Sequence, residues 1–315
     1  MDIIKRIHDI GIIPVVTVKD AESALEMSKA LAEGGISIAE FTFRTDAAVS
    51  AIRLVSKELP NMLVGAGTVL SIDQVKSASD AGASFMVSPG INQEVVEYCL
   101  DNEIPIFPGV STASEIDLAS RLGLSVVKYF PAETTGGLAN IKALSAPFPK
   151  MKFIPTGGIN LNNLNSYLAF NKILACGGSW MVGTNLSYDE IRDAAKKAVD
   201  TMLDFGFAHI GINEKTEDDA DKLTRFFCDA FSLEYIMKVP SIFAGLPIEV
   251  MKNGGRGENG HIGFFTNNVE RAVYHLEARG YEFNQTTARI DDNNNRTFIY
   301  FVGEYGGFAI HIVER

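Results

Sequence analysis

The stretch "IIPVVTVKDAESALEMSKALAEGGISIAEFTF", residues 12–43, decides the fold class of the first part of the chain. It holds an apolar run at 12–18, an amphipathic stretch at 21–35 and a second apolar run at 38–43. Such a pattern predicts a strand, a helix and a strand, and Gly34 is placed to end the helix. Because a helical crossover is the usual link between parallel strands, the stretch predicts a parallel sheet.

The same alternation continues to about residue 200. Gly82 and Gly123 are placed to end later helices, as Gly34 does. Eight evenly spaced strands favour a (β/α)8 TIM barrel over a doubly wound open sheet, and no GxGxxG turn follows the first strand. The further strands are expected at 63–69, 85–88, 104–109, 125–130, 152–158 and 173–178.

After a final helix at 187–203 the pattern changes, so the sequence predicts a barrel domain at 1–204 and a second domain at 205–315. The second part has a strand, a helix and several short strands, and it repeats this order once. Each copy opens with "HIG", at 209–211 and at 261–263. We therefore expect an α/β protein in which the barrel is followed by a smaller α+β domain of paired βαβββ modules.

Composition limits the classes of function. The net charge of −11 over 315 residues argues against a nucleic-acid-binding protein, which needs a basic face. The three cysteines are widely spaced, which fits a reducing compartment. The first residues lack the apolar core of a signal peptide, and no apolar run is long enough to span a bilayer. A cytoplasmic protein without membrane partners is expected.

Lys128 lies inside "VVKYF", an apolar run typical of a buried strand. A lysine there is either at a strand edge with its amine in solvent, or an amine placed to react. Alternation in "AEFTFRT" puts Glu40, Thr42 and Arg44 on one face of an earlier strand. Glycine pairs follow the last two barrel strands, in "TGGI" and "GGSW", where barrels often bind phosphate through backbone N–H groups. These features together favour a reactive site over a structural ion pair.

Residues 10–200 resemble the KDPG/KHG aldolase family, the class I aldolases of 2-keto-3-deoxy-6-phosphogluconate (KDPG) and 4-hydroxy-2-oxoglutarate (KHG). The resemblance rests on motifs in family order and at family-like spacing, "EFTFRT", "VGAGTV", "VSPG", "IPIFPGVSTASE", "VKYFPAE", "PTGGI" and "GGSW". It implies a barrel that is commonly a homotrimer and works without a metal. It also implies cleavage of KDPG to pyruvate and glyceraldehyde 3-phosphate, and of KHG to pyruvate and glyoxylate.

The resemblance assigns a role to each matching residue. Lys128 matches the Schiff-base lysine and Glu40 matches the acid/base. The family residues that surround the keto-acid end of the substrate correspond to Arg44, Thr68 and Pro89 in this sequence. Phe130 corresponds to a family residue that packs on the substrate. The phosphate-binding loops of the family correspond to the segments with Gly157, Gly158, Gly178 and Ser179 in this sequence. The implied partner is a small phosphorylated keto-sugar acid.

Three alternatives remain open from the sequence. The substrate can be the galactonate epimer of KDPG, because the reacting atoms are the same. The barrel can be an inactive sugar-acid-binding scaffold, with activity in the second domain. A phosphate-binding isomerase or epimerase is a third class, but it does not require a buried lysine in the sixth strand.

Residues 205–315 resemble the vicinal-oxygen-chelate superfamily, which includes glyoxalase I and extradiol dioxygenases. In that superfamily, paired βαβββ modules hold a divalent metal with residues of their first and last strands. The corresponding residues here are His209, Glu249, His261 and His311. Three imidazoles and a carboxylate suit Zn, Ni, Fe or Mn, and the alternative is a metal-free cup. His275, in the helix at 268–279, is expected on a solvated face.

Overall fold

The computed structural model describes residues 2–183 and 185–315. The chain divides into two compact units, Met1–Met202 and Leu203–Arg315, which are described one at a time. Within the described ranges, no helix combines the length and the hydropathy that crossing a membrane requires.

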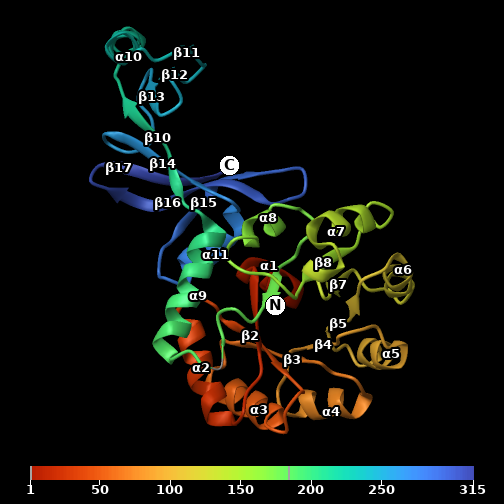
Figure 1. The fold of residues 1–315 in the computed structure, drawn as a ribbon. Coiled ribbons are helices and arrows are strands. Elements are labelled where there is room, and N and C mark those ends of the chain that lie inside the picture. Colours follow the sequence, from red (N-terminus) through yellow and green to blue (C-terminus); the bar gives the residue numbers. More distant parts are fainter. Residues whose placement is uncertain (1, 184) are drawn as a thin grey trace. The chain divides into compact units, whose positions relative to one another are not determined.

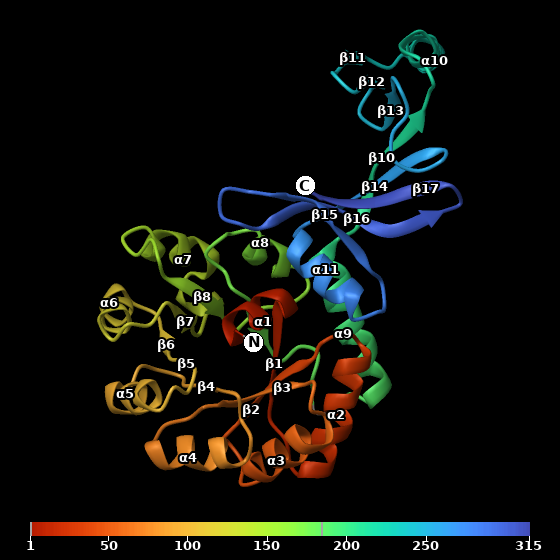
Figure 2. The same cartoon turned by 180° about the vertical axis from the view of Figure 1, so that it is seen from behind.

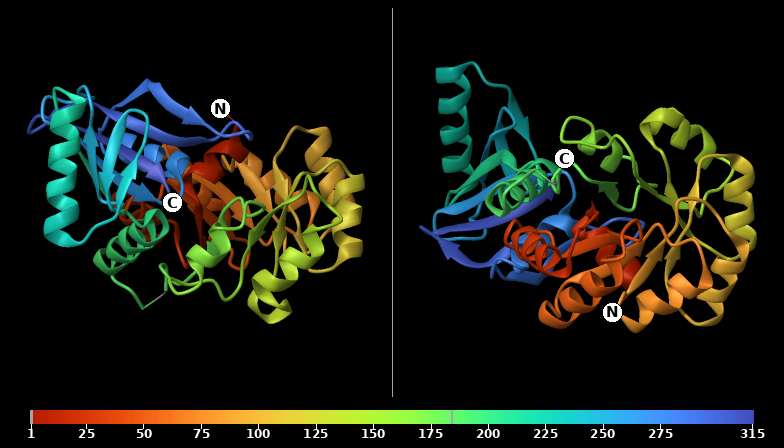
Figure 3. Two further views of the ribbon diagram at one scale, coloured as in Figure 1. Left: turned by 90° about the horizontal axis from the view of Figure 1, so that it is seen from above. Right: turned by 60° about the horizontal axis from the view of Figure 1, so that its bottom comes forward.

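The first unit alternates strands with helices, and the helices lie around the outside of the strands (Figures 1 and 3). Its strands are β1 (Ile12–Val16), β2 (Ile38–Thr42), β3 (Leu63–Gly67), β4 (Phe85–Val87), β5 (Ile106–Phe107), β6 (Gly109–Val110), β7 (Val126–Tyr129), β8 (Lys152–Pro155) and β9 (Cys176–Gly178). Its helices are α1 (Ile3–Ile10), α2 (Ala21–Glu33), α3 (Ala48–Glu58), α4 (Ile72–Asp80), α5 (Gln93–Asp101), α6 (Ala113–Arg121), α7 (Gly137–Ser145), α8 (Leu164–Leu168) and α9 (Tyr188–Leu203), with a 3-10 turn η1 (Glu133–Thr135).

All strand pairs of this unit are parallel and form a curled sheet. The order is β5-β4-β3-β2-β1-β9 in one part and β6-β7-β8 in the other. The strand expected at 104–109 is split into β5 and β6 by Pro108, which has no N–H group for the ladder. Because β5 pairs with β4 and β6 pairs with β7, this one segment connects the two parts.

Local sequence determines where the helices begin and end. Asp20 caps α2 by accepting a hydrogen bond from the Ser23 N–H at 2.7 Å. Gly82 and Gly123 adopt left-handed backbone angles just past their helices, with φ of 103° and 87°. After α2 the left-handed residue is Gly35 (φ 94°), whereas the expected Gly34 is still right-handed. Gly34 therefore caps α2, as the sequence predicts, and the left-handed turn follows at Gly35.

The second unit is one eight-stranded sheet with two helices (Figure 2). Its first half contains β10 (Gly206–Asn213), α10 (Glu217–Phe231), β11 (Tyr235–Met237), β12 (Ser241–Ala244) and β13 (Ile248–Met251). Its second half contains β14 (Gly260–Thr266), α11 (Val269–Glu277), β15 (Phe283–Ile290), β16 (Arg296–Tyr305) and β17 (Phe308–Glu314).

Both halves follow the same path. The order β11-β12-β13-β10-β14-β17-β16-β15 places the first strand of each half beside its last. Those two pairs, β10 with β13 and β14 with β17, are parallel. The antiparallel pair of β10 and β14 joins the halves. The first strands of both halves are thus neighbours at the centre of the sheet.

The expectation that His275 lies on a solvated face is wrong. Its side chain is buried, with 2% exposed. Arg271, four residues earlier on the same face of α11, is buried as well, so this face is not solvated. A polar residue on an amphipathic helix takes its environment from the position on the helix and not from its own polarity.

Candidate functional site

The strands of the first unit bring Lys128 and Glu40 together, although 88 residues separate them in the chain. Lys128 on β7 donates a hydrogen bond from Nζ to Oε1 of Glu40 on β2, at 3.1 Å. The exposed fractions are 6% for Lys128 and 3% for Glu40. Leaving either charge unpaired at such burial is costly, so each group holds the other in place. An amine and a carboxylate are thereby in direct contact inside the sheet.

Gly67 makes the position of Glu40 possible. It is the last residue of β3, directly beside the end of β2, where it pairs with Thr42. A Cβ atom on Gly67 would lie 2.7 Å from Cγ of Glu40 and would overlap with its Oε1. Gly67 was not identified from the sequence, although the run of small residues in "VGAGTV" is a signal that could have indicated it.

We expect Gly67→Ala to lower kcat/KM by about 10²-fold, because displacing a reactive group by an ångström has an effect of that order. Steady-state kinetics of the purified variant measure this loss. The matched control is Gly90→Ala, because a Cβ there would meet nothing within 4 Å. Equal losses in the two variants would contradict the role of Gly67.

Other predicted residues follow the strand ends at the same edge of the sheet. Phe130 is half-buried and its ring centroid is 5.5 Å from Nζ of Lys128. Thr68 follows β3 in a left-handed conformation (φ 58°), which is uncommon for a residue with a branched Cβ. Arg44 and Pro89 are exposed beyond β2 and β4. Among the described residues, no hydrogen bond joins Arg44 to Lys128 or Glu40.

The two glycine pairs lie on neighbouring segments. A parallel bridge pairs Thr156 with Gly177, which brings "TGGI" beside "GGSW". Gly157 and Gly158 both have left-handed angles, with φ of 101° and 85°. The loop after β7 is bound to this region, because the Ala132 and Glu133 N–H groups donate to the carbonyls of Thr156 and Gly157. Gly178 is buried, and Ser179, next in the chain, is exposed.

Thr156 was not identified from the sequence. Its Oγ1 is buried and has no hydrogen-bond partner among the described residues. A Cβ on Gly177 would overlap with this hydroxyl, so the glycine leaves the space for it. Buried hydroxyl groups are normally hydrogen-bonded, so Thr156 is a donor available at this edge of the sheet.

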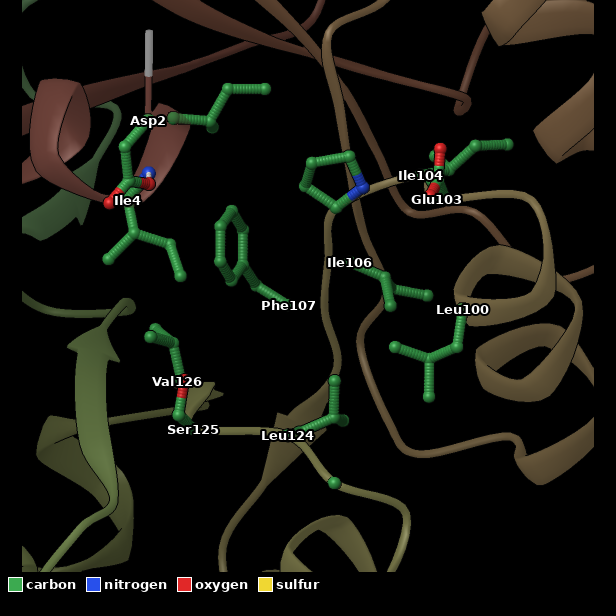
Figure 4. Close-up of a pocket in the computed structure, with 13 residues that line it drawn as sticks. Asp2, Ile4, Leu100, Glu103, Ile104, Ile106, Phe107, Leu124, Ser125 and Val126 are labelled. Carbon is green, nitrogen blue, oxygen red and sulfur yellow. Dashed lines mark hydrogen bonds between the residues drawn. The ribbon is translucent and has the colours of Figure 1, made fainter.

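A cavity of about 430 Å³ lies at the opposite, amino-terminal edge of the strands (Figure 4). Ser125 and Val126, at the start of β7, line it together with Ile104 and Phe107 (Figure 4). The other lining side chains are mostly apolar. Reactive groups of such folds lie at the carboxyl ends of the strands, so we do not assign this cavity to the reaction.

In the second unit, four predicted side chains converge on one point. The Nε2 atoms of His209 and His261 are 3.0 Å apart, and those of His209 and His311 are 3.3 Å apart. Oε2 of Glu249 lies 3.2 Å from Nε2 of His261 and 3.4 Å from that of His209. The ligand atoms of the three histidines all lie within 4.8 Å of one another.

The two "HIG" triplets explain how the imidazoles fit. Across the β10–β14 pair, His209 lies opposite Gly263 and Gly211 lies opposite His261. A Cβ on Gly211 would lie 2.5 Å from Nε2 of His261. A Cβ on Gly263 would lie 2.9 Å from Cε1 of His209 and 2.7 Å from Nε2 of His311. Each half therefore supplies a histidine and the space for the histidine of the other half.

Burial sets the charges in this cluster. It lowers the pKa of His209, and together with His209 and His261 it lowers the pKa of His311 to about 3. Burial alone would raise the pKa of Glu249, but hydrogen bonds with His261 and with the Ser241 hydroxyl (2.6 Å) outweigh it and lower that pKa. At neutral pH, His209 and His311 are thus neutral, with lone pairs available, and Glu249 is ionised.

The sequence matches the family described as "Aldolase: KDPG and KHG aldolase" over residues 3–199. It is 49% identical over 180 residues to the 2-dehydro-3-deoxy-phosphogluconate aldolase of Treponema pallidum, covering 57% of this chain and 86% of that protein. It is 42% identical over 193 residues to the KHG/KDPG aldolase of Escherichia coli K12, covering 60% of this chain and 91% of that protein. A crystal structure of the Legionella pneumophila KDPG aldolase holds pyruvate, captured at low pH as a covalent carbinolamine. It matches with a TM-score of 0.60 and 36% identity, covering 62% of this chain and 98% of that one.

Proposed function

Because this chain belongs to the KDPG and KHG aldolase family, which are carbon–carbon lyases, we propose that its first unit cleaves KDPG through a Schiff base on Lys128. The observation that carries this proposal is the buried contact of 3.1 Å between Lys128 and Glu40. The reaction needs a nucleophilic amine and a proton carrier within reach of the same substrate atoms. The covalent carbinolamine in the Legionella relative supports the same chemistry here.

The covalent steps begin at Lys128. Its ammonium first transfers a proton to Glu40. The neutral amine that results attacks the C2 carbonyl carbon of KDPG and forms a carbinolamine, which takes back that proton on its hydroxyl and loses water to give an iminium. The C4 hydroxyl then loses its proton, the C3–C4 bond breaks, and its electron pair moves into the iminium to form an enamine. Glyceraldehyde 3-phosphate leaves. Protonation of the enamine at C3 and hydrolysis release pyruvate and restore Lys128.

Glu40 carries the protons in these steps. Its carboxylate is in contact with Nζ, so it can take one proton from the Lys128 ammonium before the attack and return it to the departing hydroxyl as the carbinolamine loses water. The same oxygen then accepts the C4 hydroxyl proton. Every step uses groups of the chain, and the mechanism requires no metal.

The two ends of the substrate are bound at the rim. Arg44 is exposed beyond β2, and its guanidinium can bind both oxygens of the keto-acid carboxylate, beside Thr68 and Pro89. Phe130 packs on the substrate beside Lys128. The adjacent loops with Gly157, Gly158, Gly178 and Ser179 bind the phosphate.

We expect Ser179→Ala to lower kcat/KM for KDPG about tenfold, since one hydrogen bond to a charged group is lost. KHG has no phosphate, so its kcat/KM stays near the wild-type value. Both rates are measured by coupling pyruvate release to lactate dehydrogenase. An equal loss with both substrates would contradict the phosphate site.

The activity itself is tested with the wild-type chain in the presence of EDTA. We expect KDPG to yield pyruvate and glyceraldehyde 3-phosphate in equal amounts. Faster cleavage of the galactonate epimer would identify that substrate instead. Absence of pyruvate with KDPG, with its galactonate epimer and with KHG would favour the inactive sugar-acid-binding scaffold. The homotrimer implied by the resemblance stays a prediction.

We also propose the finer architecture of the chain. The first unit is a closed (β/α)8 barrel, supported by the continuous segment of β5 and β6 and by the bridges Phe153–Ile173 and Thr156–Gly177. The second unit is a vicinal-oxygen-chelate domain of paired βαβββ modules, supported by the identical strand order of its halves. We place the boundary of these domains at 204/205, close to the division between Met202 and Leu203.

In the second domain, His209, Glu249, His261 and His311 would hold a divalent metal, namely Zn, Ni, Fe or Mn. The donor set fits, because ligands about 2.1 Å from a tetrahedral ion lie ~3.4 Å from one another. The distances of 3.0 to 3.4 Å between neighbouring donor atoms are close to that value. When bound, such an ion polarises carbonyl oxygens and acidifies bound water. Ser241 orients Glu249 through its hydrogen bond.

We expect Gly211→Ala to weaken metal binding by about 10- to 100-fold, because the added Cβ displaces His261. Competition with a zinc-binding dye measures the affinity, and elemental analysis of protein purified without chelator measures the content. The control is Gly206→Ala on the same strand, where a Cβ approaches only the flexible end of Arg315. Metal at trace level in the wild-type chain would refute the site.

A further inference from the structure

The histidine cluster of the second unit lies in a pocket of about 340 Å³. Aromatic side chains form much of its wall, namely Phe243, Phe298 and Tyr300. Since one water takes about 30 Å³ in the liquid, the pocket has room for a compound of roughly ten non-hydrogen atoms. Its size therefore fits a small metabolite and excludes a polymer.

Two cations line the same pocket, Lys238 and Arg289. Nζ of Lys238 lies 4.3 Å from the ring centroid of Phe243, and Cζ of Arg289 lies 4.4 Å from that of Phe298. Stacking on an aromatic ring orients a long cationic side chain without neutralising it. Within residues 2–183 and 185–315, neither cation forms a salt bridge, so both charges remain available to a ligand.

The two cations occupy related places in the two halves. Lys238 follows β11 and lies over a ring of β12, and Arg289 is on β15 and pairs with Phe298 on β16. Each half thus places one cation at the hairpin between its second and third strands. Both cations line the pocket that contains the histidine cluster, and each half of the unit supplies one of them.

The charge of the pocket is opposite to that of the chain. The chain carries a net charge of −11, but this lining holds two cations and one carboxylate, Glu249. The carboxylate is already engaged by Ser241 and His261. Local cations in a pocket with apolar walls concentrate anionic ligands.

We propose that this pocket binds a small organic acid, whose carboxylate is held by Lys238 and Arg289 while its other oxygens face the histidine cluster. The proposal rests on the metal site proposed above, because an acid with a second oxygen beside its carboxylate can reach the cations and the metal together. The carboxylate of the acid gains charge-assisted hydrogen bonds from both side chains.

The test uses oxalate and the full-length, zinc-loaded chain. Isothermal titration calorimetry is expected to show one oxalate bound per chain, and oxamide, its neutral analogue, bound at least tenfold more weakly. The double variant with Lys238→Met and Arg289→Met is expected to bind oxalate at least tenfold more weakly than wild type, with unchanged zinc content. The charge-matched control is Lys215→Met with Lys222→Met, two exposed lysines outside the pocket, and it should bind like wild type.

The outcomes separate the two proposals. If zinc is absent from the wild-type chain, both the metal site and the acid site are refuted. If zinc binds but oxalate does not, only the acid site is refuted. Equal oxalate affinity in the two double variants also refutes the acid site, because Lys238 and Arg289 would then make no contribution to oxalate binding. Thermal unfolding of all variants checks that a loss reflects the pocket and not the fold.

Discussion

Lys128→Met will lower kcat for KDPG cleavage by about 10⁵-fold or more, because no other group replaces a covalent nucleophile. Methionine fills a similar volume without a charge, and Glu40 then remains as a buried carboxylate without its amine partner. Pyruvate release measured over hours with a coupled assay gives the residual rate. Circular dichroism confirms that the variant is folded.

Lys152→Met is the matched control for this variant. Lys152 begins the neighbouring strand β8, where it is exposed, and it pairs with Val126 of β7. Its backbone is therefore on the strand beside Lys128, and among the described residues no hydrogen bond or ion pair joins its amine to Glu40. We expect its kcat to stay within about twofold of wild type, as usual for an exposed substitution away from a site. A comparable loss in both lysine variants would mean that Lys128 has a structural role only.

Glu40→Gln will lower kcat by about 10²- to 10⁴-fold, which is the usual contribution of a positioned general acid or base. The amide keeps the shape of the side chain and its hydrogen bond to Lys128 but carries no proton between steps. The rate at which the pyruvate methyl protons exchange in D2O, followed by NMR, reports enamine formation directly. We expect it to fall together with kcat.

The control for Glu40→Gln is Glu33→Gln, which changes an exposed carboxylate at the end of α2. It is expected to leave both rates unchanged. Exchange at the wild-type rate in Glu40→Gln would show that another group carries the proton. Thr156, whose buried hydroxyl has no hydrogen-bond partner within residues 2–183 and 185–315, would then be the next residue to substitute.

Much of the first unit could be predicted from local sequence. The apolar runs and helix caps locate the strands and helices because they depend on residues a few positions apart. Lys128 was identifiable because a cation interrupts an apolar strand, and Glu40 because alternation puts it with other polar groups. The split at Pro108 follows from a missing N–H group, but which neighbour each part pairs with depends on the whole sheet.

The contacts between distant segments could not be predicted in the same way. The distance between Lys128 and Glu40, and the space that Gly67 leaves for Glu40, depend on the curvature of the sheet. In the second unit the "HIG" repeat indicated two equivalent strands. That each glycine faces the histidine of the other half follows from the register of β10 and β14, which no local pattern encodes.

The central claim is that Lys128 forms a covalent bond with the substrate, and trapping tests it most directly. The wild-type chain is incubated with pyruvate, reduced with borohydride, digested and analysed by mass spectrometry. We predict one reduced pyruvate adduct per chain, on the peptide that contains Lys128, and none in Lys128→Met. An adduct on a different lysine, or no adduct at all, would contradict the mechanism.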